Sequence, residues 1–375
     1  MSEQDVDPQR QAQAREYSKL TRRLLYLEMA VGAVFLLAVL LSGLSSGLRN
    51  FLAFPQSARV ALYFLILVLS YTTITVPLSV YRGFILPHRY GISHQSRRSW
   101  LADEAKEMGL GLALGTALVI VIYLLMQAFP QTWWLLAFAF IALLSVVMTR
   151  LAPVLILPLF FKLAPLNDTE MRQRLLSLAE RCQIKIKDVY QIDFSDKMST
   201  GNAMLMGWGK TRRIAISDTL LLHYTPEEIE VIMAHELGHQ RHKDIARLIA
   251  AQAILMLLGF YLINLTLNWA APRLDLDGVS DVAALPLLAL VLAALALVLA
   301  PLVNAYSRRL EEAADNYALT ATNNPDAFTT MLTKLTNQNL ADSEPSRWIE
   351  LMFYDHPPYY KRLELAQRYR REKVL

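Results

Sequence analysis

Residues 225–244 read TPEEIEVIMAHELGHQRHKD, and this stretch decides how the rest of the chain is interpreted. Its first residues are typical of the start of a helix. Thr225 is a favoured N-cap residue, Pro226 suits the first helical position, and Glu228 completes a Thr-x-x-Glu capping box. The stretch therefore predicts a helix that begins at Thr225 and carries the motif described next.

Ten residues past the cap the sequence reads His-Glu-Leu-Gly-His. On a helix, His235 and His239 are four residues apart, so both imidazoles leave one face and can share one metal ion. Glu236 is displaced around the helix and reaches a metal-bound water, which suits a general base. With two imidazoles bound, a catalytic Zn²⁺ still requires a third protein ligand and an open position for water. The motif therefore predicts a catalytic zinc site.

Long apolar runs dominate the remaining sequence, which is 54% hydrophobic overall. Each run reaches the roughly 20 residues that a helix needs to cross a bilayer. Buried core helices of a soluble protein would not explain six runs of this length. We expect an α-helical multi-pass membrane protein with six transmembrane helices around a chamber. The runs are 29–48, 60–80, 108–129, 133–161, 245–270 and 283–305.

Lysine and arginine positions predict the orientation in the membrane. The polar segments 1–28, 81–107, 162–244 and 306–375, which six spans place on one side, hold 5, 5, 12 and 10 of the 37 basic residues. This bias places both termini and the His-Glu motif in the cytoplasm. The net charge of +4 then reflects orientation in a lipid bilayer, and no nucleic-acid partner is expected. The single cysteine is consistent with a reducing compartment.

The apolar runs also divide the chain. Residues 1–28 are expected to form a cytoplasmic tail whose polar part is solvated or frayed. Residues 29–161 form an N-terminal membrane domain with four spans. Residues 162–375 form a zinc metallopeptidase domain that includes the two further spans, 245–270 and 283–305.

A small β-structure is predicted ahead of the helix that carries His235 and His239, which we call the metal helix. Residues 202–206 and 213–216 can pair as a hairpin around a turn at 207–211. A free strand edge near a metalloprotease site can bind an extended peptide by strand addition. An ordinary structural hairpin explains the same spacing equally well.

Candidates for the third ligand and for further catalytic groups lie near the C-terminus. Glu311 and Asp315 are four apart on a helical stretch, so Glu311 could bind the metal while Asp315 orients a histidine ligand. Glu312, about 100° around the helix, is the rival ligand. His356 precedes two prolines and could bind an oxyanion or a substrate carbonyl with help from Arg362, or be an ordinary surface histidine.

Several of these pieces together resemble one family, the integral-membrane zinc metalloproteases of the type I CAAX prenyl protease family. The resemblance covers most of the chain. AHELGH is shared with many zinc proteases, whereas the other blocks are more specific. The matching blocks are YRGFILPHRYGISHQS at 81–96, LPLFFKLAPL at 157–166, GNAMLMGWGKTRRIAISDTLL at 201–221, AHELGH at 234–239, SRRLEEAAD at 307–315 and HPPYYKR at 356–362.

The resemblance implies roles for named residues. It assigns the third zinc ligand to Glu311, as in the His-Glu-x-x-His…Glu arrangement of gluzincins. It implies that Asn202 and Ala203 lie on a strand that docks substrate, and that His356 and Arg362 lie near the scissile bond. It also implies a helical bundle around a large water-filled chamber with zinc at the cytoplasmic end.

The sequence departs from the family in one respect, because the family's eukaryotic members have seven spans and this chain has six. Its compact outer loops suggest a bacterial inner membrane. We therefore expect a membrane-embedded zinc endopeptidase that acts on peptide or protein substrates, prenylated or otherwise membrane-associated. One alternative is a prenyl-independent quality-control protease for misfolded or stalled membrane proteins. A second is a non-catalytic membrane scaffold or chaperone.

Overall fold

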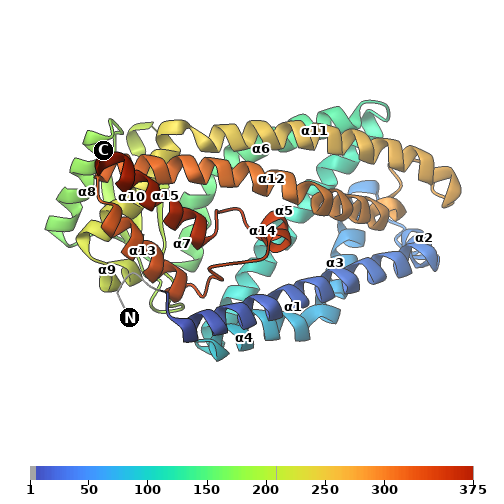
Figure 1. Cartoon of the computed structure of the whole chain (residues 1–375). Coiled ribbons are helices and arrows are strands. Elements are labelled where there is room, and N and C mark those ends of the chain that lie inside the picture. The colour runs from blue at the N-terminus through green and yellow to red at the C-terminus, as the bar shows by residue number, and fades with distance from the viewer. Residues whose placement is uncertain (1–5, 208, 375) are drawn as a thin grey trace.

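A computed structural model describes residues 6–207 and 209–374 of the 375-residue chain. Within these residues the protein is mostly helical, with one small sheet. Figure 1 shows α1 and α3 along one side of the molecule and α11 and α12 along the other, with α5 crossing between them. The shorter helices α8, α9, α10, α13 and α15 gather at one end, where the C-terminus also lies (Figure 1).

The elements follow in chain order. The helices are α1 (Pro8–Leu41), α2 (Leu44–Phe51), α3 (Gln56–Val80), α4 (Leu86–Arg89), α5 (Arg97–Ala128), α6 (Trp133–Leu155), α7 (Leu157–Phe160), α8 (Thr169–Arg181), α9 (Asp218–His223), α10 (Pro226–His242), α11 (Asp244–Ala270), α12 (Leu285–Thr322), α13 (Pro325–Gln338), α14 (Arg347–Phe353) and α15 (Tyr359–Val374). The strands are β1 (Leu163–Pro165), β2 (Asp188–Ile192), β3 (Ala203–Met206) and β4 (Arg213–Ser217).

Six helical segments among the described residues are long and apolar enough to cross a membrane, which confirms the predicted number of spans. They have mean hydropathies between 1.9 and 2.9 over their most apolar windows. Many of their large apolar side chains are exposed, as expected for helices that face lipid. The spans are Pro8–Leu41, Gln56–Arg89, Arg97–Ala128, Trp133–Phe160, Asp244–Arg273 and Val282–Thr322.

The first span corrects the prediction of a solvated or frayed tail. Helix α1 already begins at Pro8, with the Asp7 side chain accepting hydrogen bonds from the first turn. Gln11 and Ala14, on the polar part, are buried. The local sequence is polar, but this end of α1 docks on another part of the protein, and that contact fixes it. The same helix ends at Leu41, because Gly43 adopts a left-handed conformation with φ 81° before α2.

Residues 81–107, one of the polar segments between the predicted spans, are largely helical. Residues 81–85 form a π-helical turn that continues α3 into α4, and Arg97 already begins α5. Only residues 90–96 connect the two helices. This short connection pairs with the segment ahead of β3, where Ser93 bridges to Met198.

The sheet has the strand order β1-β2-β4-β3. β1 pairs antiparallel with β2, β2 parallel with β4, and β4 antiparallel with β3. The predicted hairpin is therefore confirmed as β3 and β4, and its turn includes Gly207 with φ 82°. An added Cβ on Gly207 would lie 2.6 Å from the Thr211 carbonyl oxygen, so only glycine fits there. β3 is an edge strand of the sheet.

Candidate metal centre

Helix α10 forms as its sequence predicts. The Thr225 side chain accepts from the Glu228 backbone N–H at 3.3 Å, and the Glu228 carboxylate accepts from the Thr225 N–H at 2.8 Å. These reciprocal bonds satisfy two of the amide groups that a helix start leaves free. The helix ends at Lys243, which adopts a left-handed conformation with φ 59° and turns the chain directly into α11.

Glycine at position 238 lets α10 approach α12 closely. A Cβ built on Gly238 would lie 3.2 Å from the Ala314 Cα and 3.2 Å from the Tyr317 Cβ, closer than an ordinary contact. The Leu-Gly pair inside His-Glu-Leu-Gly-His is thus part of the packing between the two helices. This approach places Glu311 of α12 against the histidines of α10.

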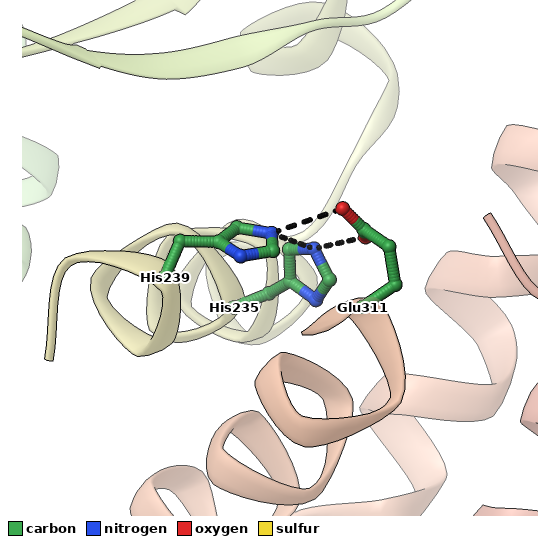
Figure 2. A group of neighbouring side chains, drawn as sticks. All are labelled: His235, His239 and Glu311. Carbon is green, nitrogen blue, oxygen red and sulfur yellow. Dashed lines mark hydrogen bonds and ion pairs between the residues drawn. The ribbon is translucent and has the colours of Figure 1, made fainter. Parts of the chain in front are cut away.

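His235, His239 and Glu311 form one cluster, in which three ligand atoms lie within 4.8 Å of one another. The two histidine Nε2 atoms are 3.1 Å apart. Glu311 Oε2 lies 3.1 Å from His235 Nε2, and Glu311 Oε1 lies 3.3 Å from His239 Nε2. Figure 2 shows the two imidazoles and the carboxylate pointing toward one another from α10 and α12.

A carboxylate holds the other nitrogen of each imidazole. His235 Nδ1 lies 2.9 Å from Asp315 Oδ1, and His239 Nδ1 lies 2.9 Å from Asp244 Oδ2. An ionised carboxylate can only accept, so each Nδ1 carries a proton, and in the neutral imidazole each Nε2 then presents a lone pair. Asp315 is itself held by Arg362, whose Nε and Nη2 donate at 2.7 and 2.6 Å.

This donor set fits a bound cation. Two Nε2 lone pairs and a carboxylate face one another, and the buried Glu311 Oε2 receives no hydrogen bond among the described residues. Such an arrangement of acceptors is repulsive unless a positive charge lies between them. A tetrahedral Zn²⁺ with bonds of about 2.0–2.1 Å has ligand–ligand edges of about 3.3–3.4 Å. The separations of 3.1, 3.1 and 3.3 Å are close to those edges.

A cleft with a volume of ≈ 370 Å³ opens beside the cluster. His235 and Glu236 line it, together with Asn202, His356 and Arg362, so it brings together most of the predicted catalytic and substrate-binding residues. Burial raises the pKa of the Glu236 carboxyl above its usual value. A carboxylate with a raised pKa takes up a proton more readily, which suits a general base.

The β3 edge supplies one wall of this cleft, through Gly201, Asn202 and Ala203. The Asn202 carbonyl accepts from the Ser217 N–H at 2.9 Å, which directs Asn202 toward β4. In an antiparallel ladder the next residue turns its backbone groups the other way. Ala203 therefore presents its N–H and C=O to the open edge.

His356 approaches the cluster from the segment before α15. Its Nε2 lies 3.2 Å from Glu311 Oε2, and its Nδ1 lies 2.8 Å from Asp355. Its side chain remains 54% exposed, so it can contact a molecule in the cleft. Asp244 was missed by the sequence reasoning, although an acid five residues after the second histidine was the available signal.

Residues 165–370 match the family model of peptidase family M48. This chain belongs to peptidase family M48. Residues 2–162 match the CAAX prenyl protease N-terminal model, which describes five membrane helices, whereas the described residues of this part of the M48 protein form four candidate spans. It is thus a membrane metalloprotease of the CAAX prenyl protease family, as the sequence blocks indicated.

Relatives of this M48 protein come from bacteria and eukaryotes. It is 29% identical to the "Uncharacterized metalloprotease YhfN" of Bacillus subtilis, covering 97% of this chain and 87% of that protein. It is 31% identical to the "CAAX prenyl protease 1 homolog" of Arabidopsis thaliana, covering 80% and 72%. Its fold matches the crystal structure of S. mikatae Ste24p with a TM-score of 0.86 at 21% identity, covering 96% of this chain and 90% of that one.

Proposed function

We propose that this metalloprotease is a zinc-dependent endopeptidase whose metal is held by His235, His239 and Glu311. The observation that carries the proposal is the convergence of two imidazole Nε2 atoms and one carboxylate, while a second carboxylate holds the other nitrogen of each imidazole. Nitrogen and carboxylate ligands in a group of three are typical of catalytic zinc sites, which leave one position open. The cleft beside the three ligands gives a substrate access to that position.

Zn²⁺ bound there supplies a Lewis acid for the scissile carbonyl and lowers the pKa of a water molecule. Glu236 takes the proton from the attacking water and passes it to the leaving amine. His356, half-exposed beside Glu311, donates a hydrogen bond to the oxygen on which negative charge develops.

Arg362 and Asp315 act together in this proposal. Because Nε and Nη2 of Arg362 both donate to Asp315, the guanidinium fixes that carboxylate, which in turn fixes the His235 ring. Arg362 also lines the cleft, so it can help to place the peptide as well. Its position behind the metal ligand makes orientation of His235 its main task.

The peptide binds as an added strand along the edge of β3. Ala203 offers its backbone N–H and C=O, and the exposed Asn202 side chain holds the peptide beside them. Leu220, Ile232, Met331 and Leu332 line the same cleft and suit an apolar substrate side chain. These contacts place an extended segment, rather than a folded domain, against Glu236.

The substrate class follows from the relatives named CAAX prenyl proteases. We propose a peptide or protein with a prenylated C-terminus, or another membrane-associated chain, cleaved at the cytoplasmic side of a bacterial inner membrane. The basic residues on one side of the spans support that orientation. The alternative is prenyl-independent quality control. The open edge of β3 favours it, because strand addition accepts many sequences.

The experiment compares two peptides of the same sequence, one farnesylated at a CAAX cysteine and one unmodified. Purified protein in detergent is incubated with each, and products are identified by mass spectrometry. Cleavage of the farnesylated peptide alone supports a prenyl protease. Equal cleavage of both supports the quality-control alternative. Failure to cleave either, with zinc bound, would contradict the proposed function.

A further inference from the structure

The beginning of α1 is bound to a segment at the edge of the cleft. We call residues 337–343, which comprise the last two residues of α13 and the five that follow it, the rim segment. The Asp7 backbone N–H donates to Asn337 Oδ1 at 3.2 Å. One turn further along, Gln11 binds the rim segment twice, and after another turn Arg15 lies 3.8 Å from Asp342. The N-cap and the first turns of α1 thus contact four residues of the rim segment through hydrogen bonds and an ion pair.

Gln11 makes the central contact. Its Nε2 donates to the Ala341 carbonyl at 3.2 Å, and its Oε1 accepts from the Ser343 N–H at 3.0 Å. The side chain is only 4% exposed, although most of its neighbours in this polar stretch are exposed. A buried amide that uses both ends on the backbone of another segment fixes the conformation of that segment.

Leu340 shows that the rim segment needs such support. Its φ is 48°, a left-handed conformation that a leucine rarely adopts. Its side chain is 2% exposed and is buried in a cluster with Ala14 of α1, Leu86 and Tyr90. The contacts that hold Leu340 in this conformation therefore come from the N-terminal membrane segments.

The rim segment also forms part of the cleft. Asn339, Ala341 and Asp342 line it together with His235 and Glu236. Asn339 Oδ1 accepts from the Gly201 N–H at 3.3 Å, next to the substrate-binding edge of β3. Gln338, just before, donates to the Ser199 carbonyl at 2.6 Å. A shift of the rim segment would therefore change the cleft wall and the start of the strand edge together.

The metal ligands are held by different contacts. His235 is oriented by Asp315 and His239 by Asp244, and neither carboxylate contacts the rim segment or α1 in any hydrogen bond or ion pair among the described residues. Loss of the α1 contact is thus expected to change how peptide binds while leaving the metal centre formed.

We propose that Gln11 is a positioning residue, through which the first membrane helix shapes the peptide-binding cleft. The proposal rests on the proposed function of the cleft as the peptide site. It makes α1 part of substrate recognition and not only part of the chamber wall. Peptides long enough to reach the rim segment depend on it, and short peptides that occupy only the metal end do not.

The test measures binding and turnover separately. Gln11→Ala is compared with Gln9→Ala, the same substitution on the exposed face of the same helix. Dissociation constants of fluorescent peptides of increasing length are measured in the zinc-loaded Glu236→Gln background, so that no turnover is required. KM, kcat and zinc content are measured with Glu236 intact.

Gln11→Ala is expected to raise the dissociation constant and KM of long peptides about fivefold or more, by loss of two buried hydrogen bonds. Zinc content, kcat and short-peptide binding are expected to match those of Gln9→Ala. Equal binding of long peptides by the two variants would overturn the proposal, as would a uniform loss of zinc and kcat. Absence of turnover in every protein, with length-dependent binding intact, would count against the proposed function and not against the positioning role.

Discussion

Replacement of Gly238 by alanine tests how closely α10 must approach α12. The new Cβ would lie 3.2 Å from the Ala314 Cα and from two atoms of Tyr317, where ordinary contacts are 3.4–4 Å. Because one of these neighbours is backbone, the helices must separate by a few tenths of an ångström. Metal sites tolerate deviations of only about 0.2 Å in ligand distance. Glu311 would therefore move away from the histidines by a distance that reaches or exceeds this tolerance.

The magnitude follows from two opposing contributions. Alanine gains about 1 kcal/mol over glycine in a helix interior. Overpacking at the helix contact costs about 1–3 kcal/mol. The net loss of unfolding free energy is then about 0–2 kcal/mol, so the protein is expected to remain folded. Zinc affinity is expected to fall at least about tenfold, which corresponds to 1.4 kcal/mol of lost binding free energy.

The matched control is Gly111→Ala in α5, where an added Cβ meets nothing within 4 Å. Zinc affinity of both variants is measured by competition with a chromophoric chelator, and stability by thermal unfolding in detergent. Gly111→Ala is expected to keep wild-type zinc affinity. If Gly238→Ala also kept it, the argument that close helix packing sets the metal geometry would be refuted.

Three further predictions concern the carboxylates behind the imidazoles. Asp315→Asn removes a charge from the partner of His235 and is expected to weaken zinc binding about 10–100-fold in the same chelator assay. Asp244→Ala is expected to weaken it to a similar degree through His239, and a zinc affinity equal to wild type would count against its orienting role. Burial opposes protonation of His235, but its contacts with Asp315 and Glu311 more than offset this and raise its pKa to about 10 before metal binds. Protons therefore compete with zinc below that pH, so zinc affinity is expected to fall as the pH decreases. Calorimetry in buffers of different ionisation enthalpy is expected to show that zinc binding releases protons. Zinc binding without proton release would contradict this account.

Local sequence signals predicted the metal helix and the number of spans correctly. The capping box of α10 depends on neighbouring residues only, and span length depends on local apolar content. The β3–β4 hairpin was also predicted, because its turn requires the glycine at 207. These features share the property that no distant contact is needed to specify them.

Features set by distant contacts were not predicted. The polar start of α1 looks like a tail, and its order comes from Gln11 binding a segment more than three hundred residues away. Asp244 reaches His239 only because Lys243 adopts a left-handed conformation between two helices. The parallel pairing of β2 with β4 likewise joins segments that local alternation cannot connect.

The central claim is that His235, His239 and Glu311 hold a zinc ion for peptide hydrolysis with Glu236 as the base. The most direct measurement is the cleavage rate of one peptide by wild type and by Glu236→Gln, each prepared with equal zinc content. The account predicts that Glu236→Gln keeps about one zinc per chain and loses about 10²–10⁴-fold in kcat. Cleavage by Glu236→Gln at the wild-type rate would contradict it.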